Sequence, residues 1–140
     1  VREALEAKSA ALAAAAVGEK RRSAAKGLKR LSESIQGMEE AAARGDILVA
    51  ERYDLEFHAE LAQMSGNEYL LMLSKSINHV FADRRAVMAI SGRMEQSMVE
   101  HQAIVAAIEA GDQTAASEAV VAHLNSVKAS VTELREARQA

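Results

Sequence analysis

Apolar side chains recur at every third or fourth position along most of the chain, the spacing that places residues on one face of an α-helix. Glycine-containing breaks divide this pattern into six segments. The predicted inward positions, segment by segment, are Arg2, Leu5, Ser9, Leu12 and Ala16; Leu28, Leu31, Ile35 and Met38; Ile47, Ala50, Asp54, Phe57, His58, Leu61 and Met64; Leu70, Leu73, Ile77, Val80, Phe81 and Arg84; Met94, Met98, His101, Val105 and Ile108; and Ala116, Val120, His123, Val127, Val131 and Leu134. The pattern therefore predicts an all-α fold, a single antiparallel bundle of about six helices around a central metal or ligand cavity.

Short stretches containing glycine mark the predicted helix boundaries. Gly18 ends the first segment. Two Gly-Asp pairs, at 45–46 and 111–112, each combine a glycine stop with an aspartate suited to cap the next helix. The third helix is therefore predicted to span about 47–64, and the break at 65–67 follows it.

The second segment, predicted to span about 19–44, begins with six basic side chains. No aromatic residue is interleaved with them, and a charge run on a helix is typical of a solvated face. We therefore expect surface positions, rather than a patch for nucleic acid, at Lys20, Arg21, Arg22, Lys26, Lys29 and Arg30.

Composition supports the helical prediction and narrows the classes of function. The 140 residues suit one domain, and they include no proline, no cysteine and only 3% aromatic residues. Without cysteine there are no disulfides or thiolate ligands, which suits a reducing compartment, so we expect a cytoplasmic protein. The net charge of −3 provides no basic field for nucleic acid. The apolar run at 10–17 is too short to cross a membrane.

The third segment carries two polar side chains on its inward face. Asp54 and His58 are four residues apart, so they point the same way, and a buried charge is costly unless it is paired or coordinated. His101 and His123 occupy inward positions on two other segments. One such histidine alone would more often be an ordinary core residue. Three imidazoles and a carboxylate facing one core suit a divalent transition metal, with zinc as first choice and nickel or manganese as alternatives.

The role of such a metal is left open by the residues themselves. Four protein ligands could close a tetrahedral structural site, or a metal with more ligands could keep positions for water or a carboxylate. Arg84 and Arg2 would add guanidinium groups that suit a carboxylate, although Arg2 at a helix end is equally well explained by snorkelling to water. Glu56 and Glu60 point off the inward face, which leaves no obvious general base, and we expect no enzyme. A metalloenzyme and a purely structural metal-stabilised bundle are the alternatives.

A further set of short motifs runs in order along the chain. They are Val1-Arg2-Glu3-Ala4-Leu5-Glu6, Asp54-Leu55-Glu56-Phe57-His58, Leu61-Ala62, Ser65-Gly66-Asn67, Glu100-His101-Gln102-Ala103-Ile104, Ala107-Ile108, Gly111-Asp112 and Ala122-His123-Leu124. Each is weak alone, but the combination resembles the FCD domain, the C-terminal effector-binding domain of FadR-subfamily GntR transcription regulators. The resemblance covers essentially all of residues 1–140, which we treat as one domain.

The resemblance implies a function as well as a fold. Metal-binding members of the family use one aspartate and three histidines, which fall here on Asp54, His58, His101 and His123. The family's inward arginines correspond to Arg2 and Arg84, and the implied effector is a small organic acid bound near the metal. Such domains form homodimers and act on operator DNA through an N-terminal winged helix-turn-helix. None precedes Val1, so we do not expect this chain alone to bind operator DNA specifically.

Overall fold

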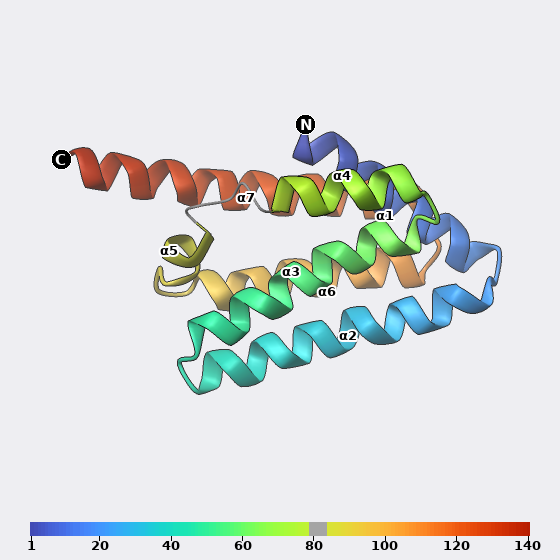
Figure 1. Cartoon of the computed structure of the whole chain (residues 1–140), viewed down its shortest axis with the longest axis horizontal. Helices are drawn as coiled ribbons and strands as arrows, with labels where there is room; N and C mark the ends of the chain where they lie inside the picture. Colours follow the sequence, from blue (N-terminus) through green and yellow to red (C-terminus); the bar gives the residue numbers. More distant parts are fainter. Residues whose placement is uncertain (79–83) are drawn as a thin grey trace.

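The computed structural model describes residues 1–78 and 84–140, and within these ranges the chain forms seven α-helices and no strands. The helices are α1 (Arg2–Gly18), α2 (Arg22–Ala43), α3 (Ile47–Met64), α4 (Glu68–Asn78), α5 (Arg84–Met88), α6 (Arg93–Glu109) and α7 (Gln113–Gln139). Successive long helices run in opposite directions along the bundle (Figure 1). The predicted all-α antiparallel bundle is confirmed.

Two pairs of helices form the frame of the bundle. α2 packs most extensively against α3, and α1 packs against α7, while α6 contacts both α2 and α7. Fully buried Leu31, Phe57, Leu61 and Ile104 fill the space between them. The α2–α3 contact is close because Gly37 has no side chain: a Cβ there would collide with the Tyr53 ring.

The face that the first helix presents to the core matches the prediction only in part, since Ser9 and Ala16 are buried as predicted. Leu5 and Leu12 are only half-buried, whereas the buried side chains of α1 are Glu6, Ser9, Ala10, Ala13, Ala14 and Ala16. Small alanine side chains allow α1 to lie close to α7, which larger leucines in the same seam would prevent. The face is therefore rotated by one position, and Glu6 rather than Leu5 enters the core.

The fourth predicted segment also differs from the structure. Leu73 was predicted to face inward but is 42% exposed. Among the described helices α4 contacts only α1 and α3, and it buries a narrow face that includes Ser74. A separate short helix, α5, follows, so the described residues form seven helices instead of six. Arg84 opens α5 and is buried, as predicted. The predictions for His79, Val80 and Phe81 lie outside the described residues.

The two predicted Gly-Asp caps are confirmed. Gly45 and Gly111 have φ angles of 68° and 70°, in the left-handed region that favours glycine. Asp46 accepts a hydrogen bond from the backbone N–H of Val49 at 3.2 Å, and Asp112 accepts one from Ala115 at 3.0 Å. These caps fix where α3 and α7 begin, and those two helices carry three of the four predicted metal ligands.

Two surface predictions can also be compared with the structure. The basic side chains at the start of α2 are exposed, as expected for a solvated face. None of the helices in the described ranges has the length and apolarity needed to cross a membrane.

Candidate metal centre

Asp54, His58, His101 and His123 converge at the middle of the bundle. Asp54 and His58 come from α3, His101 from α6 and His123 from α7, and all four are buried. One nitrogen or oxygen atom from each lies within 4.8 Å of the corresponding atoms of the other three. Four side chains that are far apart in sequence thus form one buried group that could hold a metal ion.

The histidines face this group with the same ring nitrogen. Nε2 of His58 lies 3.5 Å from Oδ1 of Asp54, and Nε2 of His101 lies 3.4 Å from the same oxygen. The Nε2 atoms of His101 and His123 are 3.3 Å apart. Ligands about 2.0–2.1 Å from a tetrahedral zinc ion would be about 3.3 Å from one another. These three distances are close to that spacing, while the four ligand atoms together span up to 4.8 Å. The nitrogen and oxygen donors fit a divalent transition metal in chemistry, and binding one with all four would draw the side chains slightly closer together.

Three of the four groups are held in the protonation state that a metal requires. Burial raises the pKa of Asp54, but the surrounding His58, His101 and Arg84 outweigh it and lower the pKa well below its usual range. Burial lowers the pKa of His101 well below its ordinary value and also lowers that of His123. Asp54 is thus a carboxylate and these two histidines are neutral imidazoles.

His58 differs from the other two histidines. Burial lowers its pKa, but the carboxylates of Glu6 and Asp54 outweigh this and raise the pKa above the ordinary value. A metal that binds Nε2 of His58 must therefore displace a proton.

Two glutamates that the sequence analysis did not single out contact the histidines from outside. Oε1 of Glu6 lies 2.6 Å from Nδ1 of His58, and Oε2 of Glu100 lies 3.3 Å from Nδ1 of His123. The His58 N–H is not aimed straight at Glu6, so that contact is a close charge pair rather than a linear hydrogen bond. The one available signal was spacing, since Arg2 and Glu6 are four residues apart on one helix.

A small cavity of about 30 Å³ lies beside the four converging side chains. Its wall includes Asp54, His58 and His123 together with Arg2, Arg84 and Arg93. Nη1 of Arg84 lies 3.3 Å from Oδ2 of Asp54, and Nε of Arg2 donates to Glu6 at 2.9 Å. The structure thus brings both predicted arginines to the centre and adds buried Arg93, which the apolar pattern did not indicate.

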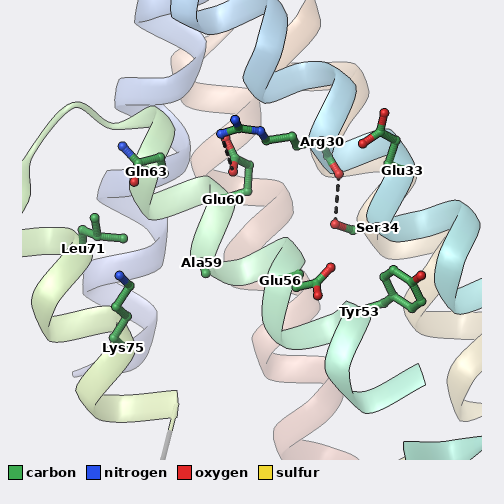
Figure 2. Close-up of a pocket in the computed structure, with 10 residues that line it drawn as sticks. All are labelled: Arg30, Glu33, Ser34, Tyr53, Glu56, Ala59, Glu60, Gln63, Leu71 and Lys75. Carbon is green, nitrogen blue, oxygen red and sulfur yellow. Dashed lines mark hydrogen bonds and ion pairs between the residues drawn. The ribbon is translucent and has the colours of Figure 1, made fainter. Parts of the chain in front are cut away.

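A much larger groove lies on another face of α3. Figure 2 shows this outer groove, about 510 Å³ in volume, between α2, α3 and α4. Its charged side chains have mixed signs, and Arg30 and Glu60 point toward each other with 3.7 Å between Nη1 and Oε2. Burial raises the pKa of Glu60, which the Arg30 charge only partly offsets. This larger hollow therefore lies away from the converging metal-type ligands.

Comparisons with known proteins agree with this arrangement. The FCD domain family matches residues 1–126. Among curated proteins, the chain is similar to the putative L-lactate dehydrogenase operon regulatory proteins of Escherichia coli (strain K12) and Shigella flexneri, with 33% identity over 103 residues in each case. These matches cover 68% of this chain and 39% of each relative, so the chain spans well under half of their length. The chain belongs to the FCD domain family of GntR-type transcription regulators, as its motifs predicted.

Proposed function

We propose that this domain senses a small carboxylate at a buried divalent metal held by Asp54, His58, His101 and His123. The observation that carries the proposal is the convergence of four metal-type ligand atoms beside a cavity lined by arginines. A bound metal would supply positive charge for a carboxylate oxygen. Arg2 and Arg84 would add guanidinium groups, which bind carboxylates through paired hydrogen bonds.

The proposed metal is zinc, with nickel and manganese as alternatives. The donor set supports this choice, because imidazole nitrogen with one carboxylate oxygen suits these ions better than magnesium or calcium, which prefer oxygen. Two glutamates near the centre, buried Glu6 and partly buried Glu100, are each paired with an arginine and a histidine. Both are thus engaged in holding other side chains, which favours a sensor over an enzyme that needs a general base.

The cavity favours a small effector. Its volume of about 30 Å³ accommodates one or two water-sized groups, whereas pockets for drug-sized ligands measure roughly 300–1,000 Å³. The curated relatives are named for an L-lactate dehydrogenase operon. L-lactate is therefore the first effector to test, followed by small di- and tricarboxylic acids. L-lactate has six non-hydrogen atoms and already exceeds the cavity, so the lining side chains would have to move apart for any of these acids, and furthest for the larger ones.

The proposed output is control of operator DNA in a homodimer. The curated relatives are longer than this chain, and the winged helix-turn-helix is proposed to lie in the part of the protein outside it. An effector that binds one arrangement of the dimer more tightly shifts the population toward that arrangement. The shift can be no larger than the difference between the effector's affinities for the two arrangements.

Metal analysis combined with thermal melts tests the proposal. We expect about one metal ion per chain after loading with zinc, nickel or manganese. L-lactate or another small acid at 100 times its dissociation constant should then add about 2.7 kcal/mol to the free energy of unfolding. Lactamide, which lacks the carboxylate, is the matched control and should add nothing. Absence of bound metal after loading with all three ions, or equal shifts with lactate and lactamide, would contradict the proposal.

A further inference from the structure

Two of the three converging histidines are held from behind by carboxylates. In His58 and His123, Nε2 faces the centre while Nδ1 contacts Glu6 at 2.6 Å and Glu100 at 3.3 Å. A neutral imidazole carries its proton on one nitrogen and a lone pair on the other. A carboxylate beside Nδ1 favours the proton on that nitrogen, which leaves the Nε2 lone pair of His123 aimed at the centre. The charge pair of Glu6 with His58 favours the same arrangement once a metal displaces the proton on Nε2 of His58.

Each glutamate is in turn held by an arginine. Nε of Arg2 donates to Oε2 of Glu6 at 2.9 Å. Nη2 of Arg93 donates to both carboxylate oxygens of Glu100, at 2.7 and 2.9 Å. The two sets therefore have the same order, arginine to glutamate to histidine, although they come from different helices: Glu6 is on α1 and Glu100 on α6.

The second of these sets is braced further. Arg93 is only 6% exposed and donates to the hydroxyls of Ser97 and Ser126, at 2.9 and 2.7 Å. All three guanidinium nitrogens of Arg93 therefore donate hydrogen bonds, which holds the group in one position. Burial raises the pKa of Glu100, but hydrogen bonds from His123 and Arg93 outweigh this and lower it. Glu100 is thus an ionised acceptor in a fixed place.

His101 provides an internal contrast. Its Nδ1 is buried and has no hydrogen-bond partner among the residues that the structure describes. Its ring instead stacks on Phe57, with 3.9 Å between ring centroids and 1° between the planes. Stacking fixes the plane of the ring but does not select which nitrogen carries the proton. Among the described residues, a carboxylate behind Nδ1 is therefore a feature of His58 and His123 but not of His101.

We propose that Glu6 and Glu100 are positioning residues that select Nε2 of His58 and His123 as the metal-binding atoms, and that Arg2 and Arg93 hold the two glutamates in place. This inference rests on the proposed metal centre. Partners of this kind typically change metal affinity by about 10–100-fold when they are removed.

Zinc affinity of the full chain tests the role of Glu100. The protein is stripped with a chelator and titrated with zinc against a chromophoric competitor. Glu100→Ala should weaken zinc binding about 10–100-fold, whereas Glu100→Gln should lose less because its amide oxygen still accepts from Nδ1–H. Glu95→Ala, an exposed glutamate on the same helix, is the control and should bind like wild type. Unchanged affinity in Glu100→Ala would overturn the proposal.

The same comparison applies to α1. Glu6→Gln and Glu6→Ala should show the same order of zinc affinities, and exposed Glu3→Ala is the matched control. Thermal melts of the metal-free variants reveal any variant that fails to fold, in which case the glutamine variant of the pair decides the outcome. Equal affinity in the glutamine and alanine variants of both glutamates would overturn the proposed choice of nitrogen.

¹⁵N NMR of the metal-free protein tests the role of Glu100 independently of whether the protein binds a metal. His123 is neutral near pH 7 because burial lowers its pKa, so its ring ¹⁵N shifts report which nitrogen carries the proton. Wild type should show Nδ1–H, and Glu100→Ala should gain the Nε2–H form. An Nε2–H wild type would overturn the positioning role even if zinc binds. Failure of wild type to bind zinc would instead overturn the proposed function, while the tautomer still reports on Glu100.

Discussion

The buried centre and the outer groove of α3 differ in volume and in the contacts of their polar side chains, and the difference shows which of them is a candidate binding site. The groove measures about 510 Å³ and the cavity beside the histidines about 30 Å³. In the groove, Arg30 and Glu60 face each other at 3.7 Å, and the Arg30 side chain is 60% exposed. At the centre, Glu6 and His58, Arg84 and Asp54, and Arg93 and Glu100 form charge pairs at 2.6–3.3 Å between side chains that are at most 13% exposed. Convergence of buried ligand-type atoms therefore identifies the candidate site better than volume does.

The same helix creates both regions. Asp54 and His58 lie on the face of α3 where side chains of α1, α6 and α7 meet them. Glu56 and Glu60 instead line the outer groove between α2, α3 and α4 (Figure 2). A shift of two residues along a helix turns the side chain by about 200°, so neighbouring positions enter opposite environments. Substitutions on the two faces can therefore be compared within one helix and one fold.

The largest expected effect concerns packing at the centre. Phe57 is fully buried and stacks on His101 at 3.9 Å. We expect Phe57→Ala to lower the free energy of unfolding by about 3–5 kcal/mol, because the lost ring leaves a cavity. Leu71→Ala in the outer groove should cost clearly less, since Leu71 is only half-buried. Urea unfolding of the metal-free variants measures both, and equal losses would contradict a tighter packing of the centre.

The next prediction compares an ion pair from each region. Arg93 and Glu100 are 6% and 12% exposed and in contact at 2.7 Å, so Arg93→Met leaves a poorly compensated carboxylate. We expect a loss of about 3 kcal/mol in the free energy of unfolding. Arg30→Met removes the exposed partner of Glu60 and should cost below about 1 kcal/mol. Chemical denaturation with and without added salt measures the difference. If Arg30→Met lowered the free energy of unfolding as much as Arg93→Met, the expected difference between the two regions would be contradicted.

Metal affinity should distinguish the two regions next. His101→Ala removes one of the four proposed ligands and should weaken zinc binding by more than about 100-fold, beyond the effect of losing an outer partner. Glu60→Ala removes a carboxylate from the groove and should leave zinc affinity unchanged. Competition with a chromophoric chelator gives both values, and circular dichroism shows whether the helices persist. Loss of effector binding with the fold retained supports the sensor, whereas collapse of the fold on removing His101 favours a structural metal.

Much of the fold could be predicted because its signals are local. The glycine stops at Gly45 and Gly111 and the aspartates that follow them act within a few residues, so the boundaries of α3 and α7 were predictable. The buried face of α1 was only partly predictable. Its alanines face the core because α7 approaches closely there, and the sequence of α1 alone carries no information about α7. The prediction for Leu73 was wrong for the same reason, because tertiary contacts decide which side of α4 is buried.

The residues of the candidate site also fall into a group that the sequence predicted and a group that it did not. Asp54, His58, His101 and His123 were predicted to face one core because each lies on its own apolar stripe, and the structure brings them together. Glu6 and Glu100 were missed because charged residues normally lie on the surface, and the histidines that they contact are on other helices. Arg93 was missed because Ser126, which helps to bury its charge, comes from α7 and meets it only in the folded bundle. Local patterns therefore predict which side chains face inward but not which charges support them.

The smallest expected effect is the pH dependence of one groove carboxylate. Burial raises the pKa of Glu60 above its ordinary 4.5, so the folded protein favours the protonated acid. Its contribution to stability is then present below about pH 4.5 and is lost as the pH rises through the higher pKa of the folded state. Glu60→Gln should lack this loss, and above that range it should be more stable than wild type by less than about 1 kcal/mol. Exposed Glu56→Gln is the control in the same groove, and its urea-unfolding profile from pH 4 to 8 should run parallel to wild type. A Glu60→Gln variant that loses stability as the pH rises would show that Arg30 dominates over burial at this position.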